Sequence, residues 1–250
     1  MFPIGDDNSD RTTVPVTNYV LIGINILVFV FLQQLGTNDH FTYEFSLVPK
    51  EITTGADLSG VYTVVDSVGN RGQIELYSSP LPVYFNFLSS MFMHGGIMHI
   101  GGNMLFLWIF GDNVEDRMGH VRYLIFYLVC GVLASLAHVF ATVMFSTDPG
   151  SLLIPSLGAS GAISGVLGGY IVLYPHRRVT AIVFRFLTDV PAYVAIGIWF
   201  AFQLISGLGM FGGGSQQGGV AYAAHIGGFI AGLALIKVFT FGRGSTPTYG

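Results

Sequence analysis

The sequence predicts an all-α, polytopic membrane protein with six transmembrane helices. Of its 250 residues, 52% are hydrophobic and only 10% are Asp, Glu, Lys or Arg, whereas an ordinary soluble domain carries about 25% charged residues. The mean hydropathy is +0.63. Six predominantly apolar runs recur along the chain, near the length of roughly 20 residues with which a helix crosses a bilayer.

The composition also excludes other classes of protein. With 10 Lys and Arg against 14 Asp and Glu, the chain has a net charge of −4 and lacks the clustered basic surface of a nucleic-acid-binding protein. Its 14% aromatic content is too high for a disordered chain. The single cysteine, Cys130, excludes an intrachain disulfide framework and a thiolate metal cluster. No cofactor is expected.

The predicted spans cover residues 17–35, 89–110, 123–145, 160–174, 190–208 and 223–240. The first is read as a retained span, because it lacks the basic n-region and the Ala-x-Ala site of a signal peptide. Pro175 stops the fourth span, and Pro191 lies near the start of the fifth. An even number of spans places both termini on one side of the membrane.

Charge and loop length set the orientation and the domain organisation. If the termini are cytoplasmic, the inner segments hold eight Lys or Arg residues and the outer ones only Lys50 and Arg71. The positive-inside rule therefore predicts a multi-pass protein of the inner cell membrane with both termini cytoplasmic. One membrane domain is expected over residues 1–250. Its parts outside the spans would be a short N-terminal tail (1–16), an outer loop (about 36–88), a mobile Gly-rich loop (207–219) and a C-terminal tail (241–250).

Polar side chains gather at the starts of the even-numbered spans. His99 and Asn103 lie in the first half of span two, Ser160 opens span four and His225 opens span six. Even-numbered spans run in the same direction, so these groups share the outer side of the membrane. Polar residues inside a membrane are functional candidates by default. Span four covers only about 22 Å, so Ser160 is expected below the surface, in a protein-lined or water-filled cavity.

Small residues predict that spans four and six pack closely. They recur every four residues in both spans, at Gly161, Gly165, Gly169, Ala224, Gly228 and Gly232. Such spacing lets two helix backbones approach closely and would bring Ser160 within hydrogen-bond distance of His225. A serine hydroxyl with a histidine base is the minimum for nucleophilic acyl transfer. His99, Asn103 and backbone N–H groups at the start of span four could then hold an oxyanion.

These motifs resemble those of the rhomboid family of intramembrane serine proteases. The matching segments are residues 94–103 (HGGIMHIGGN), 115–117 (EDR), 158–161 (GASG) and 224–232 (AHIGGFIAG). The resemblance implies a rhomboid-like fold and a serine endopeptidase that cleaves transmembrane protein substrates in or near their spans. It implies Ser160 as nucleophile, His225 as general base in a dyad without a third acid, and His99 with Asn103 as the oxyanion-binding pair.

The resemblance also implies structural roles and shows one departure. Glu115 and Arg117 resemble a structural pair at the inner end of span two, and Gly158, Gly161 and Gly228 are motif glycines. Some rhomboids carry an aromatic residue one turn below the nucleophile, which supports the histidine ring. That position is Ser164 here, so another group must orient His225, and Tyr222 is one candidate.

Other interpretations remain beside this one. Taken alone, Ser160 would more often be a helix-packing residue than a nucleophile, and Ser164 is a rival nucleophile. His94 and His138 are interpreted as structural, and Cys130 as inert packing. A metal site of His94, His99 and His225 is disfavoured because the chain has no His-Glu-x-x-His helix.

Two alternative functions differ from proteolysis. One is a catalytically silent rhomboid-like protein that binds or escorts membrane clients. The other is a solute channel, which the lack of a continuous polar path through the inner halves of the spans disfavours. The sequence does not name a substrate or an oligomeric state.

Overall fold

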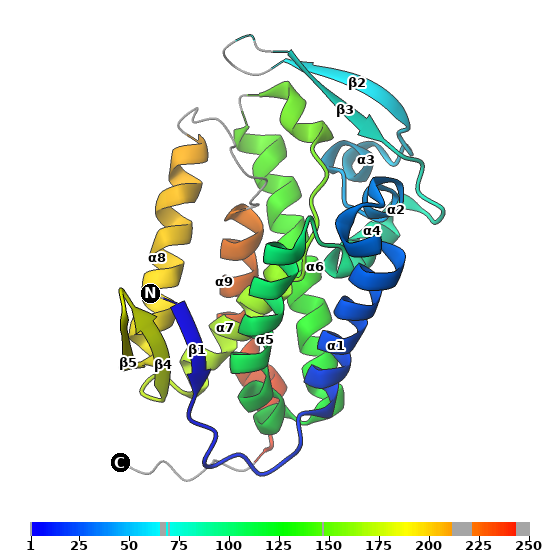
Figure 1. Ribbon diagram of the computed structural model, residues 1–250. Helices are drawn as coiled ribbons and strands as arrows, with labels where there is room; N and C mark the ends of the chain where they lie inside the picture. The colour runs from blue at the N-terminus through cyan, green and yellow to red at the C-terminus, as the bar shows by residue number, and fades with distance from the viewer. Residues whose placement is uncertain (1, 66–68, 70, 147, 212–221, 244–250) are drawn as a thin grey trace.

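A computed structural model describes residues 2–65, 69, 71–146, 148–211 and 222–243. Six long helices form its body (Figure 1). They are α1 (Val16–Leu27, continued by a π-helical turn at Val28–Leu32), α5 (Ile97–Met118), α6 (His120–Phe145), α7 (Ser160–Leu173), α8 (Ala192–Phe211) and α9 (Tyr222–Thr240). Each of these helices overlaps one of the six predicted spans.

The long helices differ from one another in length and in apolar character. Within the described residues, α6 and α9 are long and apolar enough to cross a membrane. Shorter apolar helices cover Val16–Leu32, Ser160–Leu173 and Ala192–Ile205. The helical class is confirmed for the body of the molecule, and the count of six spans remains a prediction.

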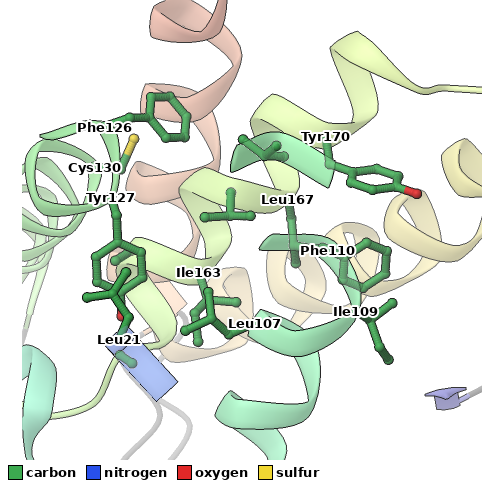
Figure 2. Packing of buried hydrophobic residues seen from close by; sticks show 14 of the residues in the cluster. Leu21, Leu107, Ile109, Phe110, Phe126, Tyr127, Cys130, Ile163, Leu167 and Tyr170 are labelled. Carbon is green, nitrogen blue, oxygen red and sulfur yellow. The ribbon is translucent and has the colours of Figure 1, made fainter. Parts of the chain in front are cut away.

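The centre of the molecule is α7. Its residues from Gly161 to Tyr170 are all buried, because α5, α6 and α9 surround it. The core between these helices holds Leu107 and Phe110 of α5 and Tyr127 of α6 against Ile163 and Leu167 of α7 (Figure 2). This burial of a whole helix explains why α7 consists of small and apolar residues with no charge.

Glycines set the distance between α7 and α9. A Cβ on Gly228 would overlap the carbonyl oxygen of Gly161, and a Cβ on Gly232 would overlap that of Gly165. The two backbones are therefore in direct contact, and the predicted close packing of spans four and six is confirmed. Cys130 of α6 packs against Gly165 from the other side, which agrees with its interpretation as a packing residue.

Two small antiparallel sheets add to the helices, and the sequence analysis had not predicted them. One has the strand order β1-β4-β5, formed by β1 (Phe2–Asp6), β4 (Arg178–Val183) and β5 (Phe186–Pro191). The other is a hairpin of β2 (Gly60–Val65) and β3 (Arg71–Leu76). The all-α class thus describes the body of the molecule but omits these sheets.

The N-terminal segment is folded onto the helices. Strand β1 pairs with β4, with Phe2 opposite Ile182 and Asp6 opposite Val179. Arg11 then forms an ion pair with Asp112 at the end of α5, at 2.6 Å. The stretch expected as a tail (1–16) therefore contributes a strand and an ion pair. The expected C-terminal tail (241–250) is described only to residue 243, and its remaining residues lie outside the described part.

The region between the first two long helices folds as well. It holds α2 (Asp39–Glu44), α3 (Pro49–Thr54), the β2–β3 hairpin and α4 (Asn86–Ser89). Val48, Leu76 and Leu153 form a small core there. Of the Gly-rich stretch 207–219, residues up to Phe211 continue α8, and the rest lie outside the described residues.

Asp6 should make stability depend on pH. The Asp6 carboxylate accepts hydrogen bonds from the Tyr170 hydroxyl at 2.6 Å and from Asn113 Nδ2 at 2.8 Å. Burial raises the pKa of Asp6 from 3.8 to about 7. Between these two values the folded state binds more protons than the unfolded state, so the contribution of Asp6 to stability falls as the pH rises from about 4 to about 7.

The Asp6→Asn variant tests this dependence. An amide oxygen still accepts both hydrogen bonds but does not ionise, so the variant should lose less stability than the parent when the pH rises from 5 to 8. Thermal unfolding in detergent at both pH values measures the difference. Equal losses in the parent and in Asp6→Asn would show that Asp6 does not titrate in this range.

Candidate active site

A serine and a histidine meet where α7 and α9 begin. Ser160 is the first residue of α7, and His225 lies in the first turn of α9. The distance between Ser160 Oγ and His225 Nε2 is 2.8 Å, which is a hydrogen bond. This contact follows from the close packing of α7 and α9 at Gly161 and Gly228. The structure thus brings together the two residues that the sequence analysis singled out.

The second ring nitrogen of His225 also has a partner. His225 Nδ1 lies 2.9 Å from Oε1 of Gln203 in α8, and the Gln203 side chain is buried, with 6% exposure. Gln203 was not predicted from the sequence, in which Tyr222 was one candidate for this place. An amide side chain inside an apolar span was the signal that could have found it.

Ser164 makes a different contact from the dyad serine. Its hydroxyl donates to the carbonyl oxygen of Ser160 at 2.6 Å, within α7. Ser164 is also fully buried. Its hydroxyl therefore serves the helix backbone, whereas the Ser160 hydroxyl contacts the imidazole.

His99 lies beside the backbone that leads into Ser160. The Gly95 N–H donates to His99 Nδ1 at 3.2 Å, so in the neutral ring Nε2 carries the proton. That nitrogen faces Gly158, where a Cβ would come within 2.8 Å of it and 3.7 Å of Ser160 Oγ. Gly158 also has φ +124, a conformation that favours glycine. Gly158 is therefore required both for the turn and for the approach of His99 to the serine.

Asn103 offers a donor to the same cavity. It lies one turn after His99 on α5 and is 8% exposed. Within the described residues its Nδ2 has no hydrogen-bond partner. A buried donor without a partner costs about 1–3 kcal/mol, and such groups are retained where a ligand or a reacting atom completes them.

These groups line one cavity of about 970 Å³. Ser160, His225, His99 and Asn103 lie along it, and Trp199 of α8 lines it as well. Further residues come from α2 and from the β2–β3 hairpin region, at Asp39, Tyr43, Gln73, Glu75 and Tyr77. The cavity thus extends from the dyad to the folded region between α1 and α5.

The remaining motif residues hold the far end of α5. The buried Glu115 carboxylate accepts from the backbone N–H groups of Thr17 at 2.8 Å and Asn18 at 2.7 Å, which satisfies free donors at the start of α1. Glu115 also contacts His120 Nδ1 at 2.5 Å. Arg117 donates to the carbonyl oxygen of Arg243 at 3.3 Å. Glu115 thus joins α5 to α1, and Arg117 joins it to the segment after α9.

The other histidine of the span-two motif lies away from the dyad contact. The backbone of His94 is held by Gln33, whose side chain accepts from the His94 N–H and donates to its carbonyl oxygen, both at 2.9 Å. The His94 ring packs edge-on against the His99 ring at 5.2 Å. This placement agrees with a structural role for His94.

Comparison with known proteins gives one consistent family. A family model described as Rhomboid domain matches residues 82–241. Rhomboid protein 1, mitochondrial, of Saccharomyces cerevisiae is 29% identical over 215 residues, covering 86% of this chain and 51% of the relative. Rhomboid protease GluP of Bacillus subtilis is 32% identical over 232 residues, covering 92% of this chain and 37% of the relative.

A third relative, from Mus musculus, covers less of the chain. This presenilin-associated rhomboid-like protein, mitochondrial, is 32% identical over 149 residues, covering 58% of this chain and 36% of the relative. The chain therefore spans about half or less of the length of these three curated relatives. Since the Rhomboid domain covers most of its length and includes the dyad, the chain belongs to the rhomboid family of integral membrane proteins.

Proposed function

We propose that this chain is an intramembrane serine endopeptidase that hydrolyses peptide bonds in or near the transmembrane segments of other membrane proteins. The observation that carries the proposal is the 2.8 Å contact between Ser160 Oγ and His225 Nε2 inside a cavity lined by His99 and Asn103. Nucleophile, base and oxyanion donors within reach of one reacting atom are the requirements of acyl transfer.

The proposed chemistry runs in two steps. His225 Nε2 takes the hydroxyl proton while Ser160 Oγ bonds to the scissile carbonyl carbon. The C–N bond then breaks, and the imidazolium returns the proton to the leaving amine, which leaves an acyl-enzyme. In the second step, water gives a proton to His225 while its oxygen attacks the ester carbonyl carbon. The bond between that carbon and Ser160 Oγ then breaks, the imidazolium returns the proton to Ser160 Oγ, and the carboxylic acid is released.

Three donors would hold the negative charge of the tetrahedral intermediate. They are His99 Nε2, the free Asn103 Nδ2 and the Ser160 backbone N–H. Donors fixed before the reaction stabilise developing charge without having to reorganise. The proposed steps therefore use only groups of this chain and water.

The proposed setting is a bilayer that the six long helices cross. The whole chain (1–250) would then form one membrane domain in the inner cell membrane, with both termini cytoplasmic. Contacts at the far end of α5 support this placement, since Arg11 pairs with Asp112 and Arg117 contacts Arg243. Arg11 and Arg243 thus lie toward the end of the bundle opposite the dyad, and the positive-inside rule would assign this side to the cytoplasm.

Cleavage by the purified chain tests the proposal. The protein is reconstituted in liposomes with a single-span substrate that carries small or helix-breaking residues near its outer end, and products are located by mass spectrometry. We expect a cut in or near the span, together with labelling of Ser160 by a fluorophosphonate probe. Neither cleavage nor labelling would instead favour a silent protein that binds membrane clients.

Replacing Asn103 with alanine should slow the reaction without unfolding the protein. Loss of one oxyanion donor typically lowers kcat by about 10²- to 10³-fold, and the donor makes no other hydrogen bond among the described residues. Asn25→Ala is the matched control, because Asn25 is also a buried asparagine, and its Nδ2 donates to Leu21 O within α1. Full kcat in Asn103→Ala would remove Asn103 from the proposed oxyanion site.

A further inference from the structure

We propose that Gln203 is a positioning residue that holds the His225 ring in the tautomer and orientation needed to accept the Ser160 proton. This inference rests on the proposed function, and it assigns a third member to what the sequence predicts as a two-residue dyad. Gln203 does not contact the reacting atoms. It acts through the opposite side of the imidazole.

The two contacts of His225 determine where its proton lies. A neutral imidazole has one N–H donor and one acceptor nitrogen. Nδ1 lies 2.9 Å from the carbonyl oxygen of Gln203, which can only accept, so Nδ1 carries the proton. Nε2 is then the acceptor nitrogen, and it lies 2.8 Å from Ser160 Oγ. The amide oxygen of Gln203 thus selects the tautomer that is ready to act as a base.

Packing of α8 against α9 holds Gln203 in place. Trp199 lies one turn before Gln203, with its ring centroid 6.0 Å from that of His225. The Trp199 ring is also 6.4 Å from the Phe229 ring, one turn after His225 on α9. Phe200 stacks on Phe229 at 4.2 Å. Gln203 therefore extends from a face of α8 that these aromatic contacts fix against α9.

Among the described residues around His225, Gln203 is the one whose side chain meets Nδ1. Ser160 faces the ring from α7, and the titratable neighbours are His99 from α5 and His138 from α6. Neither neighbour is a carboxylate. A charged acid at this depth would have to be desolvated at considerable cost, whereas an amide provides a strong acceptor without a charge. Gln203 thus fills the place that an aspartate has in soluble serine proteases.

The test compares three variants of Gln203 in the full chain. Gln203→Leu removes the acceptor oxygen. Gln203→Asn shortens the side chain by one methylene group, which moves the acceptor oxygen away from His225 Nδ1. In both, we expect kcat to fall by at least about 10-fold with KM little changed, since Gln203 is not among the described residues that line the cavity. Gln203→Glu keeps an acceptor oxygen and should therefore have a higher kcat than Gln203→Leu.

The pH profile separates positioning from a merely structural role. The carboxylate introduced by Gln203→Glu would stabilise the imidazolium, so the acid limb of kcat against pH should move to higher pH by about 1–3 units. A residue that only packs would leave this limb in place. Phe202→Leu is the matched control on α8, because Phe202 is 61% exposed, and it should keep the parental kcat and pH profile.

Tautomer measurement gives a readout that does not depend on cleavage. Nitrogen-15 NMR of labelled histidine should show His225 protonated at Nδ1 in the parent chain and a mixture of tautomers in Gln203→Leu. The inference would be wrong if Gln203→Leu kept the parental kcat, if Gln203→Glu left the acid limb of the pH profile in place, or if His225 of the parent chain were protonated at Nε2. A parent that neither cleaves nor labels at Ser160 would instead overturn the proposed function, whatever the tautomer.

Discussion

Replacing Ser160 with alanine is expected to reduce peptide-bond cleavage by about 10⁴-fold or more, to the background of the assay. The side chain at this position supplies the hydroxyl that lies 2.8 Å from His225 Nε2. His225→Ala should have a similar effect, because the Ser160 hydroxyl is a weak nucleophile when no base accepts its proton. Removing both residues should cost little more than removing one, since they act as a unit.

Initial rates on the reconstituted single-span substrate measure this effect. Ser164→Ala is the matched control, because Ser164 lies one turn along the same helix and its hydroxyl donates to the Ser160 carbonyl oxygen. We expect this control to keep the parental rate. A rate that survives in Ser160→Ala but is lost in Ser164→Ala would transfer the nucleophile to the deeper serine.

Adding one methyl group at Gly228 is expected to cause the largest loss of stability. In Gly228→Ala the new Cβ would overlap the Gly161 carbonyl oxygen. This oxygen is part of the helix backbone, so α7 and α9 must separate. Overpacking of this kind typically costs about 1–3 kcal/mol. Because the same contact sets the distance between Ser160 and His225, kcat should fall together with stability.

Gly23→Ala serves as the control for Gly228→Ala. Gly23 lies within α1, and a Cβ there would meet nothing within 4 Å. Alanine favours a helix over glycine by about 1 kcal/mol, so this variant should be as stable as the parent or slightly more stable. Thermal unfolding in detergent compares the three proteins. If Gly228→Ala unfolds at the temperature of Gly23→Ala, the contact between α7 and α9 is looser than the structure shows.

The positions of several long helices could be predicted because their signals are local, but the predicted span 89–110 began and ended eight residues before α5 (Ile97–Met118). The predicted span 123–145 lies within α6 (His120–Phe145), and the predicted span 160–174 exceeds α7 (Ser160–Leu173) by one residue. Apolar composition marks the body of each helix, and Pro175 follows the end of α7. Glycine spacing was equally informative, since Gly228 and Gly232 do contact the α7 backbone.

The pairing of β1 with β4 could not be predicted in the same way. Strand β1 pairs residues near the start of the chain with residues of β4, such as Phe2 with Ile182. A local sequence pattern does not show which distant segment of the chain will complete a sheet. The predicted fifth span also began at residue 190, inside β5, whereas α8 begins at Ala192. The strand and the helix are both apolar there, so composition alone does not mark the boundary.

The same distinction between local and long-range information applies to the candidate site. The sequence by itself determined which groups are candidates, because the residue types of Ser160, His225, His99 and Asn103 and their order along the predicted spans predict a nucleophile, a base and two donors at one depth. Only the tertiary structure decided what faces the second nitrogen of His225. Gln203 is 22 residues away from it, on another helix, and their contact depends on how α8 packs against α9. That packing is a property of side chains from both helices together, which no single stretch of sequence contains.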